Sequence, residues 1–241
     1  MGDLLIGTLD SASGATGLLI VSESAEIRSG PHRSMAQLAH RIAAAGYPVF
    51  RYDRRGVGDS AGSNHGFLQS SPDIAAAATT FRREAQLRRV VAFGNGDAAS
   101  ALTLFHPEAR IDALLLANPV TVGPATTVEE SDDEDRQAPR GWIRQMISRS
   151  PVRRPDVTPS ITSDLAAALV KAELPITLLL ATRDETATAF ADALHKPAFA
   201  AAGTRLRRKQ FDTASHVFAH TADKAWLYER VIEALAEQRA P

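Results

Sequence analysis

Two residues late in the chain have the types and the order of a proton-transfer pair. Asp184 follows an apolar stretch at 176–182, and His216 lies in the loop FDTASHVF that precedes the last helical segment. In catalytic triads of one common chain order, an aspartate and then a histidine follow the nucleophile. We therefore predict that His216 and Asp184 are catalytic residues, with Glu185 as the nearest competitor for the acid. Three other histidines have weaker contexts: His32, His65 and His220.

The position at which this order predicts a nucleophile is occupied by a glycine. The strand-like stretch at 89–94 runs into GNGDA (94–98) and then into a helical segment, AASALTLF. A strand, a sharp turn between small residues and a helix form a nucleophile elbow, which lifts its central side chain above a sheet. Gly94 and Ala98 fit the small positions, but the centre is Gly96. We expect the geometry of an elbow without its reacting atom.

Several interpretations of Gly96 stay open. In the first interpretation, the protein is a catalytically silent binding or interaction protein, because loss of a nucleophile leaves only weak residual catalysis. Alternatively, His216, oriented by Asp184, activates water above Gly96 or abstracts a substrate proton. A third interpretation makes Asp97 the nucleophile, although it lies one position past the elbow centre. The remaining ones are that Gly96 is itself an introduced change, or that a displaced hydroxyl acts from Ser22, Ser24 or Ser100.

A nucleotide site is a weaker alternative. Gly94 and Gly96 follow a strand-like stretch, but position 99 is alanine, so the full G-x-G-x-x-G pattern is absent. The sequence also has no P-loop, no clustered metal-ligand motif and no basic-aromatic pattern for nucleic acid. We predict no cofactor and no metal.

The elements that position these residues follow from the alternation of apolar runs with alanine-rich runs. Near-continuous apolar runs are typical of buried parallel strands, and the alternation indicates a sheet with helices on both faces. We predict an α/β fold with a doubly wound, mostly parallel sheet. The predicted strands cover 17–22, 47–53, 89–94, 112–118, 176–182 and 205–211, with an additional edge strand at 4–10. Besides the helix after the elbow, helices are predicted over 32–46, 72–85 and 222–238.

The length of 241 residues requires only one domain. We expect a single domain over 1–241. Within it, the stretch at 120–165 interrupts the alternation and holds the acidic cluster EESDDED. Such a stretch is either a solvated insertion or a lid over a pocket.

The composition limits the partners. The formal net charge of -1 gives no reason to expect nucleic acid, and the absence of cysteine excludes disulfides and a cysteine nucleophile. The N-terminus lacks the pattern of a signal peptide, and no stretch of about 18 apolar residues predicts a membrane span. We expect a cytoplasmic protein whose partner is a small-molecule acyl substrate or ligand; its oligomeric state stays open.

Five segments make the sequence resemble the α/β-hydrolases associated with exosortase systems. The resemblance spans nearly all of the chain and implies an α/β-hydrolase fold acting on an ester, thioester or similar acyl compound. The segments are EIRSGPHR (26–33), PVFRYDRRGVGDSAG (48–62), PDIAAA (72–77), RRVVAFGNGDAASAL (88–102) and IDALLLANP (111–119). The resemblance also implies that three residues of the segment at 48–62 are scaffold: Asp53, Arg54 and Asp59.

Two departures from that family touch the site. The family has a cysteine where this chain has Gly96, and a Gly-Gly pair where this chain has Glu23 and Ser24. The loop after the first central strand normally supplies one backbone N–H to the oxyanion hole, and the residue after the nucleophile, here Asp97, supplies the other. The resemblance thus assigns Ser22, Glu23, Ser24 and Asp97 to oxyanion or substrate binding. A glutamate in this loop is expected to narrow the hole or to charge it.

Overall fold

One seven-stranded sheet organises the described part of the chain. The computed structural model describes residues 3–23, 25–121, 158–203 and 205–239. The strand order is β1-β3-β2-β4-β5-β6-β7, in which only β1 is antiparallel to its neighbour. The strands are β1 (Gly7–Asp10), β2 (Thr16–Val21), β3 (Val49–Tyr52), β4 (Arg89–Asn95), β5 (Ala113–Ala117), β6 (Ile176–Ala181) and β7 (Arg207–Phe211).

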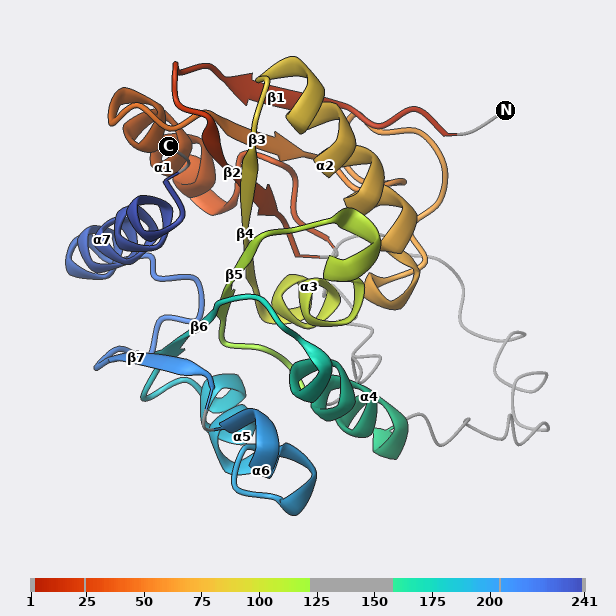
Figure 1. The fold of residues 1–241 in the computed structure, drawn as a ribbon, viewed down its shortest axis with the longest axis vertical. Coiled ribbons are helices and arrows are strands. Elements are labelled where there is room, and N and C mark those ends of the chain that lie inside the picture. Colours follow the sequence, from red (N-terminus) through yellow and green to blue (C-terminus); the bar gives the residue numbers. More distant parts are fainter. Residues whose placement is uncertain (1–2, 24, 122–157, 204, 240–241) are drawn as a thin grey trace, which may run out of the picture.

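Helices cover both faces of this sheet (Figure 1). The α-helices are α1 (Ser34–Ala44), α2 (Ser71–Glu84), α3 (Gly96–Ala109), α4 (Thr158–Lys171), α5 (Glu185–Ala193), α6 (Ala200–Gly203) and α7 (Thr221–Glu237). Short 3-10 turns are η1 (Pro31–Arg33), η2 (Phe67–Gln69) and η3 (Pro197–Phe199). The predicted α/β fold class is confirmed, and each predicted strand is present with ends that differ by a few residues.

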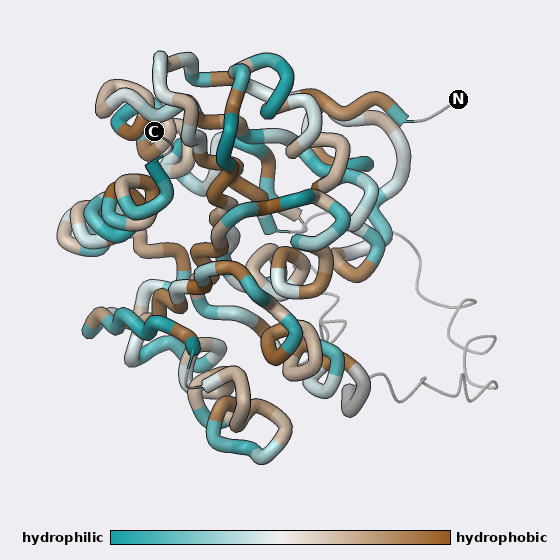
Figure 2. Tube along the Cα trace, in the orientation of Figure 1, coloured by the Kyte–Doolittle hydropathy of each residue, from teal (hydrophilic) through white to brown (hydrophobic). Residues whose placement is uncertain are grey.

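Alternate residues along the central strands enter two different hydrophobic clusters. In β2, Leu18 and Ile20 pack in the cluster that contains α1 and α7 residues, whereas Leu19 and Val21 pack in the cluster that contains residues of α2, α3 and α4. This follows from strand geometry, because successive side chains point to opposite faces of a sheet. The hydropathy colours show the result, with apolar strands at the centre and polar residues on the outer helix faces (Figure 2).

The segment predicted as an insertion or lid falls mostly outside the described residues. Residues 122–157 are not described, so the interpretation of this segment stays a prediction. Its last part opens α4, and Ile161 and Leu165 of that helix are buried in the core. None of the described helices is long and apolar enough to cross a membrane.

The parallel strands bring distant residues to one edge of the sheet. Glu23 follows β2, Gly96 follows β4, Asn118 follows β5, Asp184 follows β6 and His216 follows β7. The carboxyl ends of parallel strands lie at the same edge, where open α/β sheets bind their ligands. The fold therefore gathers five polar or turn residues from across the sequence at one place.

Candidate active site

The turn between β4 and α3 has the backbone of a nucleophile elbow. Gly96 adopts a left-handed conformation, with φ of 55°, and starts α3 directly after the strand. The turn is tight, because a Cβ on Gly94 would lie 2.8 Å from the carbonyl carbon of Ala98. The sharp strand-to-helix turn is thus retained with glycine at its centre.

His216 and Asp184 meet at this elbow. Asp184 caps α5 by accepting a hydrogen bond from the backbone N–H of Ala187 at 2.8 Å, and the same Oδ1 lies 3.1 Å from His216 Nδ1. On the other side of the ring, His216 Nε2 lies 3.0 Å from the point where a Cβ on Gly96 would stand. Glu185 is exposed in the first turn of α5. Asp184, and not Glu185, is therefore the carboxylate that contacts the histidine.

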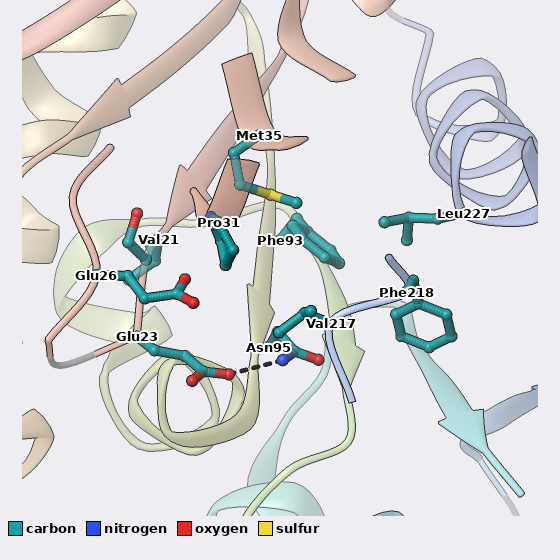
Figure 3. A pocket seen from close by; sticks show the side chains of 11 residues that line it. Val21, Glu23, Glu26, Pro31, Met35, Phe93, Asn95, Val217, Phe218 and Leu227 are labelled. Atoms are coloured by element: carbon teal, nitrogen blue, oxygen red, sulfur yellow. Dashed lines mark hydrogen bonds between the residues drawn. The ribbon is translucent and has the colours of Figure 1, made fainter. Parts of the chain in front are cut away.

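The space above Gly96 is filled by the side chain of Glu23. Its Oε1 would lie 2.5 Å from a Cβ on Gly96, and it lies 3.2 Å from His216 Nε2. The same oxygen accepts a hydrogen bond from Asn95 Nδ2 at 2.6 Å (Figure 3). A carboxylate from the loop after β2 thus stands where an elbow side chain would begin.

Two carboxylates on one imidazole favour its charged form. The hydrogen bond to Glu23 is the largest cause that raises the pKa of His216, to about 9, and the hydrogen bond to Asp184 adds to it, while burial opposes both. At neutral pH the ring is therefore an imidazolium that donates to a carboxylate from each nitrogen. A histidine in this state is a proton donor and not a base.

A second glutamate, Glu26, lines the same cavity as Glu23. Burial raises the pKa of Glu26 to about 7, and repulsion from Glu23 and Asp97 adds to the rise, although His216 acts in the other direction. Figure 3 shows both carboxylates on the cavity side of their loop. The site thus holds more acidic groups than His216 alone can neutralise.

The cavity beside Glu23 is small. It has a volume of about 20 Å³, room for about one water molecule. Its polar lining consists of Ser22, Glu23, Glu26 and Asn95, and apolar residues such as Phe93 and Phe218 form the rest. Ser22 is buried, and its Oγ has no hydrogen-bond partner among the described residues.

Two asparagines that the sequence did not single out hold the site together. Asn118 is fully buried; it donates to the carbonyl oxygen of His216 at 2.8 Å and accepts from the backbone N–H of Ala181 at 2.9 Å. Its Nδ2 also lies 3.3 Å from Asn95 Oδ1. A sequence signal existed, since each asparagine ends an apolar strand at the edge where parallel strands place their ligands.

The residues predicted as scaffold make structural contacts. Asp53 is fully buried and accepts hydrogen bonds from the backbone N–H groups of Arg28 at 2.6 Å and Asp59 at 3.1 Å. Arg54 is also buried, and its Nη2 donates to Asp97 at 3.2 Å. The Asp97 carboxylate is thus engaged with an arginine on the neighbouring loop.

The other candidate residues lie away from the dyad or outside the description. Ser100 Oγ is hydrogen-bonded to the backbone of Val120, at 2.8 Å from its carbonyl oxygen and 3.0 Å from its nitrogen. His220 caps α7, whereas His32 and His65 are exposed. Ser24 lies outside the described residues. Within the described ranges, no group of three or more His, Asp or Glu side chains is arranged to hold a metal ion.

Comparison with known proteins identifies the family and the fold. A family model described as "Serine aminopeptidase, S33" matches residues 32–164, more than half of the chain. No curated protein sequence matches the chain. A structure of Est1E from Butyrivibrio proteoclasticus with bound ferulic acid is 16% identical, with a TM-score of 0.70 over 98% of this chain and 96% of that one.

Two further solved structures share the fold at low identity. The monoacylglycerol lipase of Paleococcus ferrophilus is 15% identical, with a TM-score of 0.62 over 97% of this chain and 99% of that one. A thioesterase domain from the curacin biosynthetic pathway is also 15% identical, with a TM-score of 0.62 over 96% of each chain. At this identity the likeness establishes a common α/β-hydrolase fold.

Proposed function

The chain belongs to the α/β-hydrolase family described as "Serine aminopeptidase, S33", and on this premise we propose that it hydrolyses a small ester or thioester at the His216–Asp184 dyad. The observation that carries the proposal is the position of His216. Its Nδ1 lies 3.1 Å from Asp184, and its Nε2 faces the centre of the elbow. This is the arrangement by which a histidine exchanges protons with a nucleophile and a leaving group.

Two likenesses support an acyl substrate. The structural neighbours are described as a protein with bound ferulic acid, a monoacylglycerol lipase and a thioesterase domain. The sequence segments that resemble exosortase-associated hydrolases point to the same class of compound, and we include that association in the proposal. A cytoplasmic location and a single domain over 1–241 also belong to it.

The direct test is hydrolysis of p-nitrophenyl acetate and of a short acyl thioester by the purified protein. We expect rates well above buffer and a loss of about 100-fold or more in His216→Ala, because the proton transfers of the hydrolysis need the ring. Asp184→Asn should also lose activity. Glu185→Gln is the matched control, since it removes the neighbouring, exposed carboxylate and should leave the rate unchanged.

The second candidate is a catalytically silent binding protein on the hydrolase scaffold. The observation in its favour is that Glu23 fills the nucleophile position and leaves a cavity of about 20 Å³. This candidate predicts that the wild-type protein hydrolyses neither substrate faster than buffer does. Hydrolysis that depends on His216 would exclude it.

A further inference from the structure

We propose that Glu23 supplies the nucleophilic oxygen that the elbow lacks, so that Glu23, His216 and Asp184 together form the reacting triad. This inference rests on the proposed hydrolysis of an ester or thioester, and it names the atom that attacks the carbonyl carbon. It explains two departures from the expected pattern together, a glycine at the elbow and a glutamate in the neighbouring loop. The glutamate takes the role that the elbow side chain would otherwise have.

The two positions are sterically complementary. A side chain at position 96 and the carboxylate of Glu23 in its present position compete for the same space, because a Cβ there would lie 2.5 Å from Oε1 and 3.0 Å from Cδ of Glu23. A Cβ atom does not approach a non-bonded atom so closely, so a side chain at position 96 would displace the Glu23 carboxylate from this place. The glycine therefore makes room for the carboxylate, and the carboxylate fills the room that a serine or cysteine side chain would take.

The polar contacts of Glu23 are those a nucleophile needs. Its Oε1 lies 3.2 Å from His216 Nε2, the nitrogen that faces the nucleophile in a Ser-His-Asp triad. Asn95 Nδ2 fixes the same oxygen at 2.6 Å. The Glu23 side chain is about a quarter exposed, so a substrate carbonyl can approach it. Carboxylates are established nucleophiles in covalent catalysis, and they need no deprotonation at neutral pH.

The first half-reaction transfers the acyl group to Glu23. The carboxylate attacks the carbonyl carbon of the ester or thioester and forms a new C–O bond. When the tetrahedral intermediate collapses, the bond to the leaving alcohol or thiol breaks, and His216 donates the Nε2 proton to the leaving atom. The products are a mixed anhydride between Glu23 and the acyl group, a free alcohol or thiol, and a neutral His216.

The second half-reaction regenerates the site. Neutral His216 removes a proton from a water molecule, and the resulting hydroxide adds to a carbonyl carbon of the anhydride. The anhydride C–O bond breaks, which releases the carboxylic acid and restores the Glu23 carboxylate beside the imidazolium. The cavity between Ser22, Glu23 and Glu26 has room for about one water molecule at this point. The two half-reactions need no oxidant and no cofactor.

Direct attack by water is the competing route, and the contacts disfavour it. A general base needs a free lone pair on His216 Nε2, but that nitrogen faces the Glu23 carboxylate at 3.2 Å. If Glu23 is the nucleophile, its contact with His216 Nε2 favours the reaction. The imidazolium beside it is then the acid that protonates the leaving group.

The experiment is to trap the anhydride with hydroxylamine while the wild-type protein turns over a short acyl thioester. Attack of hydroxylamine on the Glu23 carbonyl of the anhydride gives a hydroxamate on this side chain, which mass spectrometry of the peptide locates. We expect the hydroxamate on Glu23 in wild type and in the control Glu185→Gln, and none in Glu23→Gln or without substrate.

The outcomes distinguish the role of Glu23 as nucleophile from the hydrolase activity itself. Hydrolysis that depends on His216, with no hydroxamate on Glu23 and with Glu23→Gln as active as wild type, would overturn the nucleophile and leave the hydrolase standing. An absence of hydrolysis in wild type would overturn both. Because the hydroxamate is sought on the wild-type protein, its detection on Glu23 does not depend on the folding of a variant.

Discussion

The Glu23 carboxylate lies 3.2 Å from Nε2 of His216, although the two residues are 193 positions apart in the sequence. The contact occupies the ring nitrogen that an elbow nucleophile would face, and Asp184 occupies the other nitrogen at 3.1 Å. The histidine is thus held between two carboxylates. The predictions below follow from this arrangement.

The first prediction concerns the protonation of His216. Its imidazole should titrate with a pKa of about 9 in wild type, and Glu23→Gln should lower that pKa because it removes the largest cause of the rise. A titration of the histidine side chains by NMR measures both values. A wild-type pKa near the ordinary 6.5, unchanged by Glu23→Gln, would contradict the ion pair.

The same shift makes stability depend on pH. The pKa of His216 is higher in the folded state than in the unfolded state, so its stabilising contribution is complete below about pH 6.5 and is lost as the pH rises through about 9. Urea unfolding at both ends of this range should show the loss in wild type. The change should be smaller in Glu23→Gln, which serves as the comparison.

The second prediction is a coupling between positions 96 and 23. Gly96→Ala should destabilise the protein by more than the cost of about 1 kcal/mol for a left-handed backbone, because the new Cβ meets Glu23 Oε1 at 2.5 Å. In a Glu23→Ala background only the backbone cost should remain. A double-mutant cycle by urea unfolding measures the difference. Additive effects would show that the carboxylate does not fill the elbow space.

A transfer of the nucleophile tests the same coupling. Gly96→Ser alone should lose the activity of wild type, because its side chain and the Glu23 carboxylate compete for one space. The double variant Gly96→Ser with Glu23→Gly should restore ester hydrolysis, since it provides both an elbow hydroxyl and room for it. Equal activity of the single and double variants would speak against a steric conflict.

Much of this arrangement could be predicted from the sequence. Near-continuous apolar runs located the strands because parallel strands are buried on both faces. The order of the elbow, Asp184 and His216 predicted a group of residues that the fold brings together. The placement of Glu23 could not be predicted, because it depends on the path of one loop and on a side-chain rotamer. The resemblance assigned this residue to oxyanion or substrate binding, and the structure places its Oε1 2.5 Å from the point where a Cβ on Gly96 would stand.

The contribution of Asn118 was missed for a similar reason. Its role rests on three hydrogen bonds, to groups of Ala181, His216 and Asn95, that only the folded chain brings together. Local patterns report helices, strands and turns, but a buried amide that links several strand ends leaves no periodic signal. The polar residue at the end of an apolar strand was the only hint.

The third prediction is that Asn118 positions His216. Asn118→Ala should cost about 1 to 3 kcal/mol of stability, because it leaves the buried N–H of Ala181 without its partner, and it should lower kcat. Asn118→Asp keeps an acceptor for Ala181 but loses the donor to the His216 carbonyl. We expect it to recover part of the stability but not kcat; recovery of both would assign Asn118 to stability alone.

The measurement that tests the central claim most directly is kcat/KM of Glu23→Gln for a short acyl thioester at neutral pH. The two routes predict different rates for this variant. A nucleophilic Glu23 predicts a loss of at least about 100-fold, because the isosteric amide is not a nucleophile. Direct attack by water predicts an equal or higher rate, because the variant frees Nε2 of His216 and lowers its pKa. A rate at or above that of wild type would contradict the role proposed for Glu23.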